Sequence, residues 1–311
     1  MSVSYKTGSA RGPTLVPVKT LSEEAFARAE DFVWRTARIL DRRRFDLVFR
    51  NGPAEPVLAA LAAYRNPDGG YGNALEPDGR GPGSQPITTL TALHILHEAG
   101  AAPDGVVEYL ESITAEGGGV PFVHPNARDY PRAPWWQVSD TYEGSLLPTA
   151  NLVGALWQAG VTHAWIESAA EYCWAKIDAL TTTHPYEALG CVGFLDNAPD
   201  RSRAQEAAAR IGKLVRDNGL VRIGAEGTVP EGYNAAELHF PHEYASTPDS
   251  LARAWFTDEE MSTSLDDLID AQHDDGGWRV RWENWTPATE HEWAGWFTVE
   301  SLRVLKAYDR W

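Results

Sequence analysis

Apolar residues recur along most of the chain at spacings of three and four, which is the period of an amphipathic helix. The first such stretch opens at Leu21 with Ser22, Glu23 and Glu24 and continues to Leu40. The same periodicity predicts helices over residues 54–65, 87–99, 104–115, 146–159, 163–180, 202–216, 248–256, 262–273 and 289–308. Residues 184–195 fit either a short buried helix or an irregular loop. With that segment the pattern predicts about eleven helices, enough for about five to six helical hairpins, and no convincing strand.

The two ends of this pattern define the expected organisation. Residues 1–19 are rich in Gly, Pro, Ser and Thr without periodicity, so we expect an extended arm ahead of one domain over residues 20–311. The run Arg42, Arg43 and Arg44 follows the first apolar stretch. We expect it to place positive charge at the carboxyl end of a helix, where the helix dipole favours it.

Several of the predicted turns share a glycine-rich pattern. The segments RNPDGGY (65–71) and QHDDGGW (272–278) have the frame Q/R-x-x-D-G-G-aromatic, and each ends a predicted helix. A degraded copy is EGGGVPF (116–122), and weaker echoes lie at 193–194 and 217–220. Glycines at positive φ reverse the chain tightly, and the Asp accepts backbone N–H bonds in the turn. The pattern therefore predicts an internal repeat of helical hairpins.

QHDDGGW resembles the QW repeat of squalene and hopene cyclases, and RNPDGGYG resembles the glycine-rich repeats of protein prenyltransferase β-subunits. The resemblance covers residues of about 55–305 and implies an α/α toroid, in which inner and outer rings of helices surround a central cavity. The alternative is a generic helical array with tight turns between antiparallel helices.

Charge and composition limit the partners and the compartment. The chain has 27 Lys and Arg against 44 Asp and Glu, a net charge of −17, so nucleic acid and anionic lipid are disfavoured. No apolar run is long enough to span a membrane, and the amino-terminal residues lack the apolar centre of a signal peptide. The two cysteines are too few for a disulfide framework, which predicts a reduced, cytoplasmic protein.

Proton-initiated cyclases share an acidic D-x-D-D motif, which this chain lacks. Its nearest candidates are Asp140 in SDTYEG and the pair Glu76 and Asp78 in NALEPDG. Asp140 precedes a helix that the resemblance assigns to the inner ring, so its side chain would face the cavity. Alternatively, Ser139 or Asp140 is a helix N-cap.

Two metal sites that the resemblance suggests are disfavoured. The prenyltransferase zinc site needs Asp, Cys and His; Glu290 and His291 stand where its His would fall, but the Cys is missing. Glu290 and His291 remain candidate acid–base groups, with a solvated helix end as the alternative. The string DDLID (266–270) matches a magnesium motif, yet its apolar residues look like the buried face of an outer helix. We therefore expect no metal and no cofactor.

Thirteen Trp residues are more than a core needs, and an aromatic-lined cavity would absorb the excess. The HFPHE segment (239–243) contains Pro241, which predicts a loop over the cavity mouth. The candidate substrate-binding residues are Trp135, Trp136, Tyr142, His239, His242, Trp293 and Trp296.

These observations favour an enzyme that acts by proton transfer on a small apolar, isoprenoid-like substrate, as a terpenoid cyclase does. One alternative is a carbohydrate-active α/α barrel, and another is a non-catalytic toroid that binds a lipid or protein. The cavity lining separates the first two. Aliphatic and aromatic walls with one or two acids indicate an isoprenoid, whereas many polar groups with paired carboxylates indicate a sugar.

Overall fold

The computed structural model describes residues 18–224 and 238–311, and every regular element in them is helical, which confirms the all-α prediction. The helices are α1 (Glu23–Thr36), α2 (Ile39–Arg50), α3 (Glu55–Leu61), α4 (Pro86–Glu98), α5 (Val106–Ser112), α6 (Leu146–Gln158), α7 (Ala164–Ala179), α8 (Pro185–Asn197), α9 (Arg201–Asp217), α10 (Pro241–Tyr244), α11 (Asp258–Asp270) and α12 (Pro287–Ala307). Short 3-10 turns lie at η1 (Ala62–Tyr64), η2 (Pro125–Ala127) and η4 (Leu251–Trp255). Within the described ranges, no helix combines the length and the apolar character that crossing a bilayer requires.

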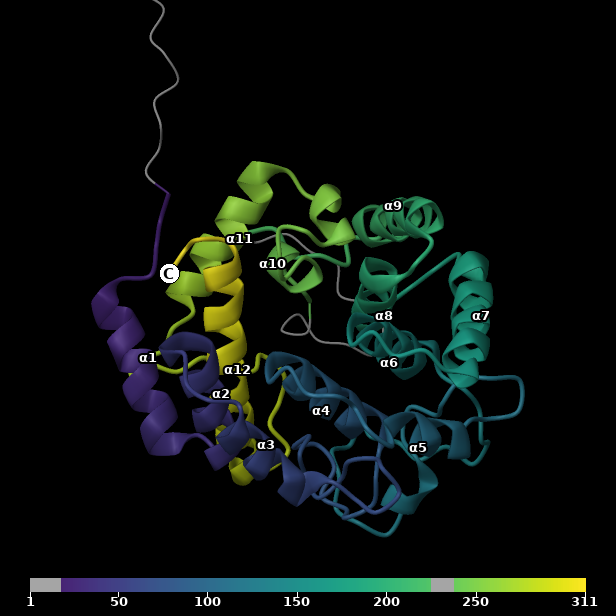
Figure 1. Ribbon diagram of the computed structural model, residues 1–311. Coiled ribbons are helices and arrows are strands. Elements are labelled where there is room, and N and C mark those ends of the chain that lie inside the picture. Colours follow the sequence, from purple (N-terminus) through teal and green to yellow (C-terminus); the bar gives the residue numbers. More distant parts are fainter. Residues whose placement is uncertain (1–17, 225–237) are drawn as a thin grey trace, which may run out of the picture.

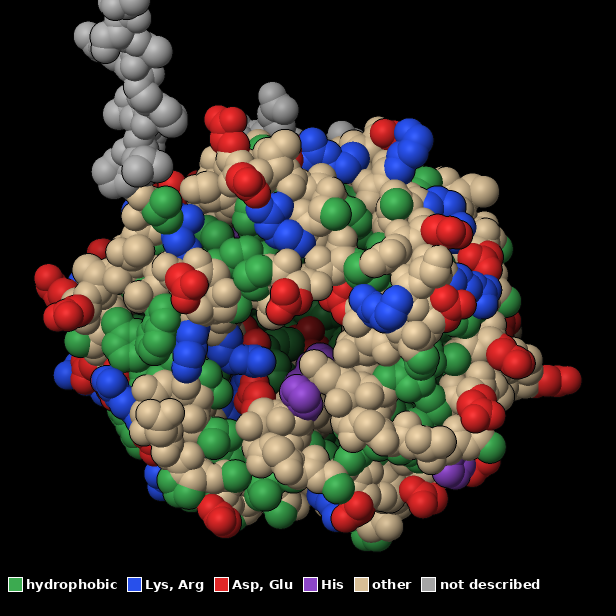
Figure 2. Space-filling model, turned by 45° about the horizontal axis from the view of Figure 1, so that its top comes forward, with side chains coloured by type: hydrophobic (Ala, Val, Ile, Leu, Met, Phe, Trp, Pro, Cys, Tyr) green, Lys and Arg blue, Asp and Glu red, His purple; other side chains and the backbone are tan. Residues whose placement is uncertain are grey.

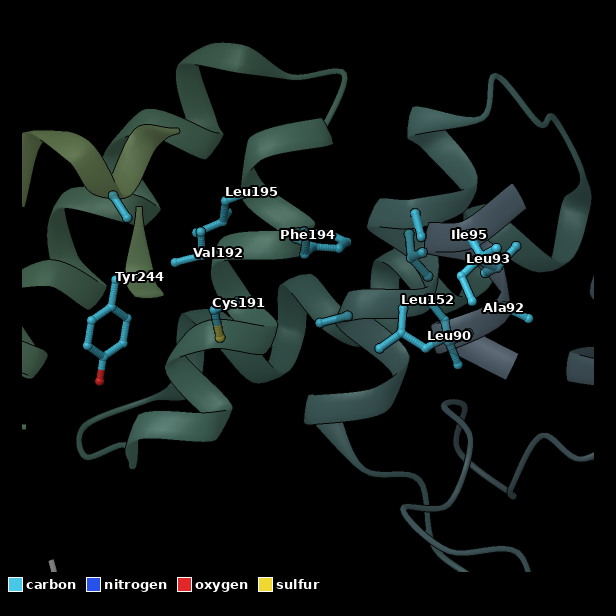
Figure 3. Packing of buried hydrophobic residues seen from close by; sticks show 14 of the residues in the cluster. Leu90, Ala92, Leu93, Ile95, Leu152, Cys191, Val192, Phe194, Leu195 and Tyr244 are labelled. Carbon is cyan, nitrogen blue, oxygen red and sulfur yellow. The ribbon is translucent and has the colours of Figure 1, made fainter. Parts of the chain in front are cut away.

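Helices α4, α6 and α8 pack in succession around a shared apolar core, to which α10 contributes Tyr244 (Figure 3). Helices α6 and α8 approach closely at Gly154 and Gly193, because a Cβ on Gly154 would lie 2.2 Å from the carbonyl oxygen of Gly193. Residues 193–194 are therefore part of a helix crossing inside α8. The expected echo of the glycine-rich turn at this position is wrong.

The end of the chain packs against its beginning. Helix α12 lies beside α1 and α2 (Figure 1). Gln272, which follows α11, donates from Nε2 to the Ala25 carbonyl on α1 at 2.8 Å. The Leu21 N–H also donates to the carbonyl of Arg310 at 2.8 Å. These contacts join the end of the chain, at α11 and α12, to its beginning, at α1 and α2.

The three glycine-rich loops have one hydrogen-bonding pattern. In each loop the N–H at the aromatic or equivalent position donates to a Thr hydroxyl on a later helix. The pairs are Tyr71 with Thr89 on α4 (3.1 Å), Val120 with Thr149 on α6 (2.9 Å) and Trp278 with Thr298 on α12 (3.0 Å). The repeat inferred from the sequence is thus present in the geometry of all three loops.

Positive φ falls on the first glycine of each DGG segment, at Gly69 (+89°) and Gly276 (+96°). Both positions are tight, since a Cβ would lie 2.0 Å from the Gly105 carbonyl oxygen or 2.2 Å from the Arg28 carbonyl oxygen. The predicted Asp role is confirmed: Asp68 accepts from the N–H two residues later at 2.9 Å, and the last loop repeats this bond.

The first predicted helix is in fact two helices. Ala37 and Arg38 are extended (ψ 158° and 155°), so α1 ends before them and α2 begins after them. The Arg38 guanidinium donates to Asp41 at 2.9 Å and to the Leu75 carbonyl at 2.8 Å, which holds this break. The expectation for the Arg42–44 run is wrong, because Arg44 is fully buried inside α2 and binds Glu98 at 2.6 Å.

The structure also settles or changes the predicted secondary structure of three other segments. Residues 184–195 form helix α8, which begins with Pro185 at its first position, where proline is favoured. Pro241 likewise begins the one-turn helix α10 and does not form a loop. The segment 248–256 contains only the 3-10 turn η4. Most of the expected amino-terminal arm, residues 1–17, lies outside the described residues.

Candidate functional site

A cavity of about 280 Å³ lies between α10, α11 and α12. Its wall combines aromatic side chains with charged and polar ones, and a hollow of mixed character is visible near the centre of the face in Figure 2. The residues that line the cavity and bear on its chemistry are Phe240, His242, Glu243, Asp267, Arg281 and Phe297. We call it the α10–α12 cavity.

An ion pair forms the polar centre of this cavity. Arg281 donates from Nη2 to both carboxylate oxygens of Glu243, at 2.7 and 2.8 Å, and also to the Leu238 carbonyl at 3.2 Å. Burial acts to raise the pKa of Glu243, but Arg281 and the neighbouring His239 and His242 together outweigh it and leave the pKa well below the ordinary value. Glu243 is therefore ionised at neutral pH and offers a fixed negative charge.

Two buried histidines, His239 and His242, flank this pair. His242 lines the cavity, and its Nδ1 lies 2.6 Å from the Ser264 hydroxyl. Burial lowers the pKa of His242 to about 4, so its ring is neutral at pH 7. His239 Nδ1 lies 3.6 Å from Glu243, too far for a hydrogen bond, and its ring contacts Tyr186 edge-on. His242 thus places a neutral imidazole beside an ionised carboxylate.

The predicted pair Glu76 and Asp78 forms a second buried group of acids. Trp135 Nε1 donates to Asp78 Oδ2 at 2.8 Å, and Trp293 Nε1 donates to Asp78 Oδ1 at 3.1 Å. Burial raises the pKa of Asp78, and the indole N–H groups oppose that rise by stabilising the charged form. Glu76 Oε2 accepts from the Asp78 N–H at 3.0 Å. Burial and the neighbouring Asp78 raise the pKa of Glu76 well above its ordinary value, so this carboxyl holds a proton readily.

An aromatic group connects the acid pair with the cavity. Trp282, Trp293 and Phe297 pack edge-to-face, with ring centroids 5.4 to 5.9 Å apart. Trp293 binds Asp78, and Phe297 lines the cavity. The two residues are one turn apart on α12, a rise of about 6 Å. The acid pair therefore lies beside the cavity wall and does not line the cavity itself.

Asp140 is placed differently from the prediction. Its side chain is 97% exposed and lies 3.4 Å from Arg128, so it faces no cavity. It is not a cap either, because helix α6 begins after Ser145.

Three other candidates also lie away from the α10–α12 cavity. Glu290 and His291 are exposed at the start of α12, and Tyr142 donates to the Ile113 carbonyl.

The two remaining aromatic candidates pack against other groups. Trp136 is buried against Gly79, and the Arg44 guanidinium lies 4.0 Å from the Trp296 ring. Among the described residues, no three His, Cys, Asp or Glu side chains lie close enough together to hold a metal ion. The charged cavity residues that the sequence did not suggest include Arg281 and Glu300.

Comparison with known proteins adds no family assignment: the chain matches no protein-family model, and no curated protein is detectably similar in sequence. The functional argument rests on the geometry of the site.

Proposed function

We propose that the chain forms a closed α/α toroid and is an enzyme that acts by proton transfer on a small polar substrate bound in the α10–α12 cavity. The toroid is supported by the contacts of α12 with α1 and α2 and by the bond from Gln272 to Ala25. The repeated loop geometry adds to this support, because equivalent loops are what a ring of helical hairpins requires.

The charged side chains of the lining decide between an isoprenoid and a sugar as the proposed substrate. An isoprenoid would have to strip water from the partly buried Glu243–Arg281 pair without replacing its lost hydrogen bonds, which is unfavourable. A sugar ring offers hydroxyl groups to both charges and an apolar face to Phe297. The lining therefore favours the carbohydrate-active alternative over the isoprenoid one.

Each group of residues has a distinct role in this proposal. Glu243, Arg281 and His242 bind hydroxyl groups and fix the orientation of the ring. Glu76 lies beside the cavity wall, outside the lining, and is the acid that we assign to the proton transfer, because burial and the neighbouring Asp78 raise its pKa well above the ordinary value. Asp78 is held by Trp135 and Trp293 and acts on Glu76 through its charge.

Calorimetric titration with neutral mono- and disaccharides, compared with isoprenoid alcohols such as farnesol, tests the proposal. We expect saccharide binding, weakened about tenfold in Glu243→Gln because a hydrogen bond to a charged group is lost. Glu283→Gln, at an exposed position of the segment that carries Arg281, is the matched control and should bind like the parent. Binding of farnesol with no saccharide binding would overturn the choice of substrate.

The terpenoid-cyclase-like function remains a second candidate, because burial raises the pKa of Glu76, two tryptophan side chains bind the neighbouring Asp78, and aromatic faces stabilise carbocations. Incubation with a polyprenyl substrate and analysis for cyclised products tests it. Products that form with the parent and disappear with Glu76→Gln would favour this candidate over the saccharide enzyme.

A further inference from the structure

The charged side chains that line the α10–α12 cavity differ in whether a side chain of opposite charge pairs with them. Glu243 is paired with Arg281, and Glu300 binds Arg44 and Arg303. Arg279, the other cation of the lining, is paired with Asp275 outside the cavity. These pairs leave Asp267 as the carboxylate whose charge the wall does not balance.

The Asp267 side chain makes no hydrogen bond within the described residues and no ion pair within 4 Å there, although it lines the cavity. Its neighbours on α11 differ, since Asp266 binds Arg310 and Asp270 binds Lys19. Burial raises the pKa of Asp267; the Arg222 charge opposes that rise, Asp270 and Asp266 add to it, and Lys19 opposes it more weakly. A cation placed beside Asp267 would therefore relieve an existing electrostatic cost.

Two further features of the wall suit a ligand that carries a cationic amine. Phe297 and Trp278 present aromatic surface, which attracts ammonium groups. His242 is 5% exposed, and its Nε2 makes no hydrogen bond within residues 18–224 and 238–311, while its Nδ1 is occupied by Ser264. A neutral imidazole with a free ring nitrogen can bind a ligand N–H or O–H group.

From this arrangement we infer that the natural ligand of the cavity carries a primary amine, and that Asp267 determines this specificity. The inference rests on the proposed function in one respect, that the cavity binds a small polar ring. An amino sugar has both parts of the recognised chemistry: hydroxyl groups for Glu243 and Arg281, and an ammonium group for Asp267.

Two matched pairs of probes separate the amine from the ring: glucosamine against glucose, and cyclohexylammonium against cyclohexanol. We expect calorimetry at pH 7 and low salt to give each amine a dissociation constant at least about fivefold lower than that of its neutral partner. Asp267→Asn should remove this preference, so that each amine binds no more tightly than its neutral partner. Asp270→Asn removes a charge from the same helix outside the cavity and should keep the preference.

The outcomes distinguish the two proposals. Equal affinity for glucose and glucosamine would overturn the amine specificity and leave the saccharide function standing. A cyclohexylammonium preference that depends on Asp267, with no sugar binding, would support the amine site and overturn the saccharide function. Binding of none of the four probes would overturn both. The preference in the parent protein is itself decisive, so the test holds even if a variant at Asp267 folds poorly.

Discussion

The most direct test of the repeat geometry is Gly276→Ala. Gly276 has φ of +96°, and a Cβ there would lie 2.2 Å from the Arg28 carbonyl oxygen and 2.5 Å from its carbon, both on α1. Two costs follow: strain from the positive φ, about 1–2 kcal/mol, and displacement of the loop from the α1 backbone, about 1–3 kcal/mol. The sum predicts a loss of about 2–5 kcal/mol in the free energy of unfolding.

Gly117→Ala separates these two costs. Gly117 has φ of +87°, but a Cβ there meets nothing within 4 Å. This variant should therefore lose only the strain, about 1–2 kcal/mol. Urea unfolding followed by circular dichroism gives both free energies, and unchanged slopes would show that the change lies in stability. Equal losses in the two variants would refute the close contact between the last loop and α1, and with it the inferred closure of the ring.

Two further predictions concern buried polar groups. Thr89→Val leaves the Tyr71 N–H without its partner and should cost about 1–3 kcal/mol by urea unfolding, whereas Thr91→Val, which loses only a bond to its own helix, should cost less than half as much. His242 has a lowered pKa of about 4, so the unfolded chain binds more protons between about pH 6.5 and pH 4, and stability should fall as pH falls through that window. A His242→Gln variant whose stability falls as steeply as the parent's over this range would contradict the assignment.

Local turn chemistry explains why the glycine-rich loops could be predicted from the sequence. The turn depends on Asp68 and on glycine at positive φ, all within seven consecutive residues. The break between α1 and α2 could not be predicted in this way. It is held by Arg38, which reaches the Leu75 carbonyl 37 positions later in the chain.

The candidate site was predictable where its residues are neighbours in sequence. Glu76 with Asp78, and His239 with His242, were found because each pair occupies one short segment. Arg281 was missed because its partner Glu243 lies 38 positions away. Asp140 was misplaced for the related reason that nearby aromatics in sequence were assumed to surround it. Trp135 instead reaches back 57 positions to Asp78.

The same interactions that join the end of the chain to its beginning also place charge at the cavity. Arg44 on α2 binds Glu98 on α4 and Glu300 on α12, and Glu300 lines the cavity. A buried guanidinium without partners would cost several kcal/mol, so α2, α4 and α12 can pack here only with both carboxylates present. The carboxylate of Glu300 is thereby neutralised by Arg44 and Arg303 and adds no net charge for a ligand to balance. This is why the unpaired charge of the cavity falls on α11, at Asp267, and why a ligand cation should be recognised there and not along α12.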